Sequence, residues 1–210
     1  MSTAAGLGTK GMPQADRRHE IVAAATAEFA EHGFAGASMA EIARTAGISK
    51  ALIYQHFDTK EHLYLACFRR IAEPLVARIR AELDGGDAPF SVPIKVLNGI
   101  FETLGPQRAA WRVFYDPTAP RSGETGSLIS HYRRHLTDFA VSGVAGFLGA
   151  LGDDDARDVD ALATVWTAIV DAVVGWAIAH PEETVEDLTA RWERIITAIF
   201  SIGARPSTVL

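Results

Sequence analysis

The chain has 210 residues, 48% of them hydrophobic, and a formal net charge of −6. It is long enough for one large domain, or for a small and a medium one with a filled core, and its acidic balance excludes a surface built throughout for phosphates or anionic lipid. The single cysteine, Cys67, excludes a disulfide framework and is typical of a protein in the reducing cytoplasm.

The N-terminal segment 1–15 is predicted to be a disordered arm. Its first thirteen residues are rich in Gly, Ala and Thr and lack the apolar run of a signal peptide, so we expect no export. The most apolar window of the chain, 164–179, has sixteen residues and contains Asp171. It is too short and too interrupted to span a bilayer, and we expect a buried helix in a cytoplasmic protein without a membrane partner.

The first predicted helix spans about 16–32. Ile21 and Phe29 lie two turns apart on one apolar face, and Gly33 ends the pattern. Phe34 follows this stop and is expected to fold back onto the same apolar cluster.

Two short helices are predicted next, separated by a glycine corner. Ser38 forms a capping box with Glu41 and begins a helix that runs to about Ala46. After Gly47, Ser49 caps a segment of barely two turns. This is the layout of a helix-turn-helix, whose second helix enters the major groove of DNA, although a three-helix subdomain without DNA contacts would use the same corner.

A dense set of residues from the first helix into the fourth carries a family resemblance. The set comprises Ile21, Ala24, Ala25, Phe29, Gly33, Phe34, Ser38, Met39, Glu41, Ile42, Ala43, Ala46, Gly47, Ile48, Ser49, Tyr54, Phe57, Lys60, Glu61 and Leu63. This run closely resembles the DNA-binding domain of TetR-type (TetR/AcrR-like) transcriptional regulators. The resemblance covers about a quarter of the chain by motif, and the remainder matches in length and helical character.

The resemblance implies which side chains touch DNA. Ser38, Tyr54 and Lys60 would contact phosphates, because hydroxyl, phenol and ammonium groups hold a duplex in register without reading sequence. Lys50 would donate to guanine, and the apolar side chains beside it would contact thymine methyl groups. The full predicted DNA-contact set is Ser38, Arg44, Ser49, Lys50, Ala51, Leu52, Tyr54, His56 and Lys60.

The rest of the chain is predicted to be helical as well. A helix over 60–83 contains Pro74, which should kink it. Longer helices follow at about 90–104, 107–116, 124–150, 154–179 and 183–202. The predicted fold class is therefore all-α, with a three-helix helix-turn-helix domain at 16–62 and a larger bundle at 63–210 that the resemblance assigns to effector binding and dimerisation.

The last two helices form a four-helix dimer interface in the resembled family. Apolar residues occur on more than one face of 162–178, as a helix between a core and a partner requires, although a core helix of a monomer remains an alternative. A homodimer would imply a palindromic double-stranded operator. The predicted interface residues are Val165, Ile169, Val173, Trp176, Leu188, Trp192, Ile195 and Ile199.

An effector pocket is expected between the helices of the larger domain. Its candidate residues are mostly aromatic and favour an apolar or aromatic effector, although each could equally be plain core. Asp171 would bind a polar ligand group or cap the dimer contact. The candidate set is Phe90, Leu97, Phe101, Trp111, Phe114, Tyr115, His131, Tyr132, His135, Phe139, Trp166 and Asp171.

The sequence favours a ligand-responsive repressor over two alternatives. His131 and His135 lack a third ligand at recognisable spacing, so neither a metal nor another cofactor is predicted. The chain has no glycine-rich phosphate loop and no nucleophile elbow, so an enzyme is not expected. A DNA-binding regulator without a sensor, either constitutive, partner-regulated or an activator, remains open. In the repressor, the 60–83 helix would swing about Pro74 when effector binds.

Overall fold

The computed structural model describes residues 14–86 and 88–203, and within them the predicted all-α class is confirmed. The predicted arm 1–15 lies outside the described residues except for its last two positions, which belong to the first helix. The elements are α1 (Gln14–Gly36), α2 (Met39–Thr45), α3 (Lys50–Phe57), α4 (Lys60–Asp84), α5 (Val92–Leu104), a 3-10 helix (Gly105–Ala110), α6 (Trp111–Phe114), α7 (Gly123–Ala150), α8 (Ala156–Ala179) and α9 (Val185–Gly203).

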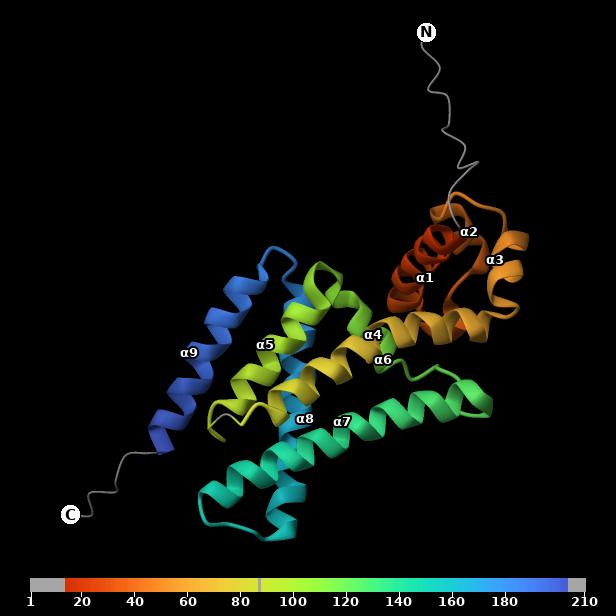
Figure 1. Cartoon of the computed structure of the whole chain (residues 1–210). Coiled ribbons are helices and arrows are strands. Elements are labelled where there is room, and N and C mark those ends of the chain that lie inside the picture. The colour runs from red at the N-terminus through yellow and green to blue at the C-terminus, as the bar shows by residue number, and fades with distance from the viewer. Residues whose placement is uncertain (1–13, 87, 204–210) are drawn as a thin grey trace, which may run out of the picture.

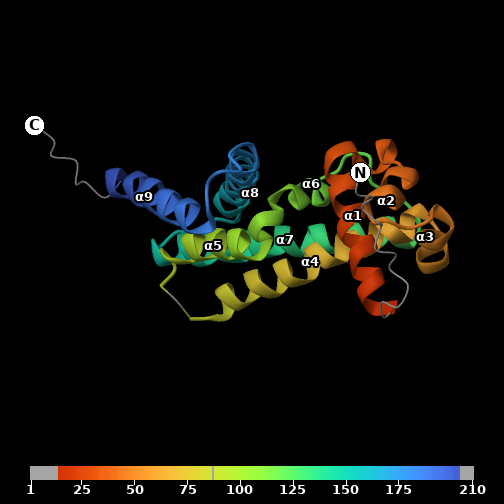
Figure 2. The ribbon, with the colours of Figure 1, turned by 90° about the horizontal axis from the view of Figure 1, so that it is seen from above.

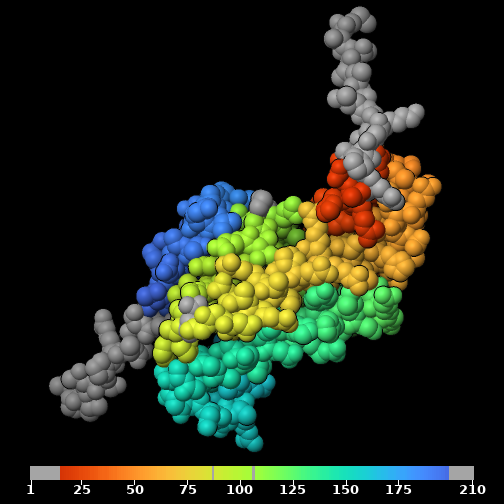
Figure 3. Space-filling view, in the orientation of Figure 1, coloured from red at the N-terminus to blue at the C-terminus, as the bar shows by residue number. Residues whose placement is uncertain are grey.

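Helix α4 joins the two parts of the molecule. Helices α1, α2 and α3 gather at one end around the start of α4, and the rest of α4 runs beside α5 and α7 (Figure 1). Helix α8 packs on α7, and α9 packs on α5 at the other end (Figure 2). The space-filling view shows the N-terminal helices and α9 on opposite sides of the surface of α4 and α5 (Figure 3).

The small N-terminal domain is held by an apolar centre. Ile21, Ile42 and Ile53 are fully buried, and Phe29 and Phe57 are nearly so. The ring of Phe34 packs on Phe29 at 6.3 Å between centroids, which confirms the expected return of the chain after Gly33. The corner between α2 and α3 uses Gly47 at φ 65°, a left-handed conformation that glycine adopts without steric cost.

The start of α2 is capped differently from the prediction. Ser38 Oγ accepts from the amide of Glu41, as expected, but the Glu41 carboxylate binds Arg44 Nε at 2.8 Å instead of returning to Ser38. Glu28 of α1 accepts from the amide of Ser38 at 2.8 Å in its place. The reciprocal capping box is therefore wrong in one half, and the substitute bond ties α2 to α1.

Helix α4 runs without interruption from Lys60 to Asp84 with Pro74 inside it, and the predicted kink at Pro74 stays a prediction. Pro74 is exposed, whereas Ile71, Ala72 and Leu75 are buried. The carbonyl left without a donor therefore lies on the solvent side, where water can reach it.

The helix predicted at 107–116 is also different. The chain forms a 3-10 helix over Gly105–Ala110, in which Gln107 is not helical, and then a single turn, α6. The turn stops at Phe114 because Asp116 is used in contacts with α1, described below. The remaining predicted helices differ from those found by only a few residues at their ends.

Among the described residues, α8 is the one helix long and apolar enough to cross a membrane, with a mean hydropathy of 1.8. It is longer than the sixteen-residue window that the sequence suggested. Its most apolar window is only 28% buried within the single chain, so the expected buried helix is wrong for most of α8. Val170, Val173, Val174 and Ala177 are the residues of its second half that lie in the core.

The buried aromatic cluster of α4 yields a stability prediction. Phe68 is fully buried, and its ring stacks on Phe114 at 4.9 Å between centroids. Phe68→Ala is expected to lower the free energy of unfolding by about 3–5 kcal/mol because a cavity remains. Arg69→Ala, an exposed control on the same turn, should change it by less than about 0.5 kcal/mol. Denaturant unfolding followed by circular dichroism measures both, and equal effects would contradict the packing.

Candidate functional site

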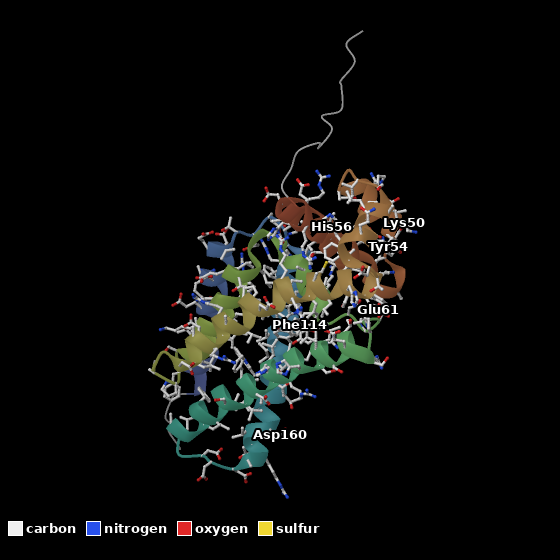
Figure 4. All side chains as sticks on the ribbon, turned by 45° about the vertical axis from the view of Figure 1, so that its right-hand side comes forward. Lys50, Tyr54, His56, Glu61, Phe114 and Asp160 are labelled. Carbon is white, nitrogen blue, oxygen red and sulfur yellow. The ribbon has the colours of Figure 1, made fainter. Side chains whose placement is uncertain are left out.

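The outer side of α3 presents a cation and a phenol. Lys50 and Ala51 are exposed, Tyr54 is 37% exposed, and the Lys50 ammonium lies 5.9 Å from the centroid of the Tyr54 ring. Both labelled side chains lie at the end of the molecule away from Asp160 (Figure 4). Leu52 is half-buried, so less of it is available to a partner.

Hydroxyl groups begin both helices of this corner. Ser38 caps α2, and Ser49 caps α3 by accepting from the amide of Leu52 at 3.2 Å. Arg44 lies on the exposed side of α2 and pairs with Glu41. An exposed pair of this kind is weak, so the guanidinium can exchange Glu41 for another anion.

Lys60 has a structural contact that the sequence did not reveal. Its ammonium donates to the carbonyl of Ala37 at 2.6 Å and lies 5.0 Å from the Phe34 ring centroid. Partial burial lowers the pKa of Lys60, and Glu28 counteracts that effect. An ammonium has three donors, so Lys60 joins α4 to the loop before α2 and keeps further donors for an anion.

Arg18 and the backbone carbonyl of His56 connect α1 to α3. The Arg18 guanidinium lies 4.4 Å from the centroid of the Phe57 ring and donates to the carbonyl of His56 at 3.4 Å. His56 is half-buried. Arg18 therefore adds a positive group beside α3 and fixes the C-terminal end of that helix.

A cavity of about 240 Å³ lies in the larger domain between α4, α5, α7, α8 and α9. Five of the predicted effector residues line it: Leu97, Trp111, Tyr115, Phe139 and Trp166. The other wall residues are Ile79, Leu83, Val92, Pro93, Val96, Ile100, Leu136, Ala140, Gly143, Val144, Phe147, Leu162, Thr167, Ile169, Val170, Val173, Trp192, Ile195 and Ile196. The wall is therefore almost wholly apolar.

Seven predicted effector residues do not line this cavity: Phe90, Phe101, Phe114, His131, Tyr132, His135 and Asp171. Phe101 and Phe114 are fully buried in the core. Phe90 is 50% exposed and packs edge-on against Phe147. The rings of Phe101 and Phe114 are packed in the core beside the cavity and not in its wall, and the ring of Phe90 packs on Phe147 near the surface.

Three members of that group, His131, Tyr132 and His135, lie on α7 and make polar contacts there. Tyr132 donates to a carboxylate oxygen of Glu73 at 3.4 Å, and the Nε2 atoms of His131 and His135 lie 3.2 Å apart. In the part of the chain that the structure describes, no three His, Cys, Asp or Glu residues come close enough to hold a metal ion.

The wall residues that the sequence did not predict are mostly aliphatic, with Phe147 and Trp192 as aromatic members. Val92, Val96 and Ile100 recur at four-residue spacing on α5, and Ile79 and Leu83 do so on α4. This spacing is visible in the sequence, but it is the same for a cavity wall and for a solid core.

The predicted dimer residues divide into two groups. Val165, Ile169 and Ile195 are exposed, at 52%, 44% and 39%. In contrast, Val173 and Leu188 are buried inside the single chain and have no surface to offer a partner, which corrects the prediction for both.

The two tryptophans of the predicted dimer set are half-buried. Trp176 stacks on His180 at 4.0 Å between ring centroids and meets Trp192 edge-on. The side chain of Ile199 lies outside the described residues.

A polar corner, made by Trp111, Tyr115 and Asp171, adjoins the cavity at α6. Trp111 Nε1 donates to Asp171 Oδ1 at 3.1 Å, so the carboxylate in the apolar α8 has a partner, and Asp171 is otherwise exposed to solvent. Burial raises the pKa of Tyr115, and the negative charge of Asp171 raises it further.

The residue after Tyr115 connects this corner to the N-terminal domain. Asp116 is 5% exposed, and its carboxylate accepts from the amide of Phe34 at 2.6 Å. It also accepts from the amide and the hydroxyl of Thr118, whose Oγ1 accepts from the amide of Ala35 at 3.0 Å. We call this group of bonds between 116–118 and 33–35 the α1 joint.

Arg133 and Gly33 support the α1 joint from two sides. The Arg133 guanidinium of α7 donates to the carbonyls of Phe114 and Asp116. Gly33 has φ 66°, and a Cβ there would lie 2.9 Å from Thr118 Oγ1. Only glycine fits both the conformation and the space.

Comparison with known proteins agrees with this architecture. The family described as "Bacterial regulatory proteins, tetR family" matches residues 21–67. The HTH-type transcriptional regulator BetI of Rhizobium meliloti is 32% identical over 146 residues, which are 68% of this chain and 70% of BetI. The HTH-type transcriptional activator FasR of Mycolicibacterium smegmatis is 42% identical over 72 residues, 34% of this chain and only 33% of FasR.

Solved structures show the same fold. The ketosteroid transcriptional regulator KstR2 of Mycobacterium tuberculosis superposes with a TM-score of 0.73 at 23% identity, over 89% of this chain and 95% of KstR2. These relatives and neighbours are regulators and not enzymes. The chain belongs to the TetR family of DNA-binding transcriptional regulators.

Proposed function

We propose that the protein is a ligand-responsive repressor that binds a palindromic operator as a cytoplasmic homodimer and leaves it when a small apolar molecule fills the cavity. One observation carries this proposal: Tyr115 is part of the cavity wall, and the next residue, Asp116, binds the backbone of α1. A molecule that moves α6 therefore acts directly on the N-terminal domain.

On the DNA side, the groups of α2 and α3 divide by role. Ser38, Tyr54 and the remaining donors of Lys60 would hold phosphates, with Arg44 and the nearby Arg18 adding positive charge. Lys50 would read guanine, and Ala51 with the exposed part of Leu52 would contact a thymine methyl. The acidic net charge of −6 makes this local positive surface the region where a duplex would approach.

On the effector side, the apolar wall selects the ligand. A cavity lined by aliphatic and aromatic side chains binds an apolar body by removing its surface from water. KstR2, whose name refers to a ketosteroid, shares the fold and supports a ligand of this general kind.

The response would pass through the α1 joint instead of a bend at Pro74. Because α4 is continuous, it would turn as one unit with the N-terminal domain attached. Displacement of Trp111 and Tyr115 would move the Asp116 carboxylate and tilt α1, which changes the separation of the two recognition helices in the dimer. Release of most operator requires a difference in ligand affinity between the two states of about 10⁴-fold, or roughly 5.5 kcal/mol.

Dimerisation would use the exposed apolar side of α8 and α9. Val165, Ile169 and Ile195 form part of that side, and two-fold symmetry would place the recognition helices about one duplex turn apart. A second candidate function, activation, is favoured by the name of FasR, which matches the DNA-binding region.

The test of this proposal is binding of the purified protein to its own upstream DNA. Fluorescence anisotropy at several salt concentrations compares that duplex with a scrambled duplex of equal length. We expect tight binding to the palindrome with one dimer per site. Equal and steeply salt-dependent binding to both duplexes would contradict operator recognition by this DNA. A reporter gene behind the same sequence distinguishes a repressor from an activator.

The exposed side of α3 yields a prediction on DNA contacts. Tyr54→Phe should weaken binding to all sequences alike, whereas Lys50→Ala should cost about 1–3 kcal/mol and relax the preference at one base pair. Arg157→Ala, which removes an exposed cation from the start of α8, is the control and should have little effect. Selection from random DNA measures the preference, and an unchanged motif for Lys50→Ala would show that the recognition helix is misplaced.

The α1 joint yields a prediction on hydrogen exchange. Asp116→Asn replaces one acceptor oxygen with a donor, so either Phe34 or Thr118 loses its bond, at a cost of about 1–3 kcal/mol. The amides of Phe34 and Ala35 should then exchange at least tenfold faster. Asp138→Asn on the exposed side of α7 is the matched control. Unchanged exchange in Asp116→Asn would refute the assigned bonds.

A further inference from the structure

The cavity wall contains no charged residue. Its described members are aliphatic or aromatic apart from Thr167, and the Thr167 hydroxyl already donates to the carbonyl of Ala163 at 2.9 Å. A carboxylate or phosphate inside the cavity would therefore lose its water and gain no cation in return. The wall selects against a buried anionic head group.

Polar groups of two kinds adjoin the cavity. The indole N–H of the wall residue Trp192 is a buried donor without a partner among the described residues. At the other place, the carboxylate of Asp171, which is exposed and not itself a wall residue, lies next to the wall residue Trp111 and acts electrostatically on the wall residue Tyr115. Asp171 Oδ1 accepts from Trp111, and among the described residues its Oδ2 and the Tyr115 hydroxyl make no hydrogen bond with protein. The cation that acts electrostatically on Tyr115, Arg133, already donates to the carbonyls of Phe114 and Asp116. This corner therefore has a carboxylate oxygen that can accept, a phenol that can accept or donate, and a negative charge.

The volume sets the size of the apolar part. A cavity of about 150 Å³ accommodates benzene, with six carbons. In proportion, the present cavity of about 240 Å³ accommodates a body of roughly ten carbons.

We propose that the cavity takes an apolar molecule of roughly ten carbons whose head group donates hydrogen bonds, a hydroxyl or an ammonium, to Asp171 and Tyr115. This inference rests on the proposed effector site and adds the polarity of its ligand. A hydroxyl would use Asp171 Oδ2 as acceptor, and an ammonium would in addition be neutralised by the carboxylate.

Tryptophan fluorescence reports occupancy directly. Trp111, Trp166 and Trp192 line the cavity, and the chain has four tryptophans in all. The full chain is titrated with three probes that share one tail, namely 1-decanol, decylammonium and decanoate, and calorimetry confirms each dissociation constant. We expect decanol and decylammonium to bind at least tenfold more tightly than decanoate.

Three variants locate the binding. Asp171→Asn keeps an oxygen for Trp111 and removes the charge, so decylammonium should lose about threefold to fivefold in affinity, as expected for an exposed charge pair. Asp160→Asn makes the same change on α8, eleven residues away and far from Phe114 (Figure 4), and should leave all three constants unchanged. Ala140→Phe fills the cavity and should abolish binding of every probe. Circular dichroism verifies that each variant is folded.

The outcomes separate this inference from the proposed function. If decanoate binds best, or if Asp171→Asn and Asp160→Asn behave alike, the assignment of the head group is overturned while the cavity remains an effector site. If no probe binds the unmodified chain, both the head-group assignment and the sensor are overturned, and operator binding is tested separately by anisotropy. Tight decanol and decylammonium binding that Asp171→Asn weakens and Ala140→Phe abolishes supports the inference.

Discussion

One buried carboxylate determines how the two parts of this molecule meet. Asp116 lies 82 residues from Phe34 in sequence, yet its oxygen accepts the Phe34 amide at 2.6 Å. The amides of Phe34 and Ala35 donate to Asp116 and Thr118 instead of to carbonyls of α1, because Gly33 leaves the helical conformation at φ 66°. A carboxylate that accepts several N–H and O–H groups at once is stable in a buried position, and its removal leaves those donors unsatisfied. The interruption of α1 at Gly33 leaves amides without helical partners, and the end of α6 at Phe114 brings Asp116 to them.

Helix α4 converts that local contact into a geometric constraint. Tyr64, which is fully buried, donates to the carbonyl of Val113 in α6, and desolvation raises the pKa of its phenol. Cys67 lies one turn further along, and burial raises the pKa of its thiol to about 12, so it is a packing residue and not a reactive thiol. The start of α4 therefore cannot move relative to α6 without breaking these contacts.

The sequence alone was sufficient for the parts of the fold that depend on local signals. Ser49 and Ser38 cap the predicted helices, and the periodicity of Ile21 and Phe29 marks the buried face of α1. It was insufficient where a distant residue decides the outcome. Glu28 replaces Glu41 in the cap of α2, and the cavity uses aliphatic residues that look like ordinary core. Phe101 and Phe114 were assigned to the cavity because aromatic character does not distinguish a wall from a filling side chain.

Ile169 and Ile195 belong to two surfaces at once. Both line the cavity, and both are substantially exposed on the side of α8 and α9 where we place the second subunit. A subunit seated there would cover part of the cavity entrance, so ligand would enter and leave the free chain faster than the dimer. The rate of ligand exchange would then depend on protein concentration, because concentration sets the fraction of dimer. At low concentration, ligand would exchange freely with the monomer. At high concentration, a bound ligand would leave only after the subunits dissociate. Ile169 and Ile195 would therefore influence how fast the ligand dissociates as well as how tightly it binds.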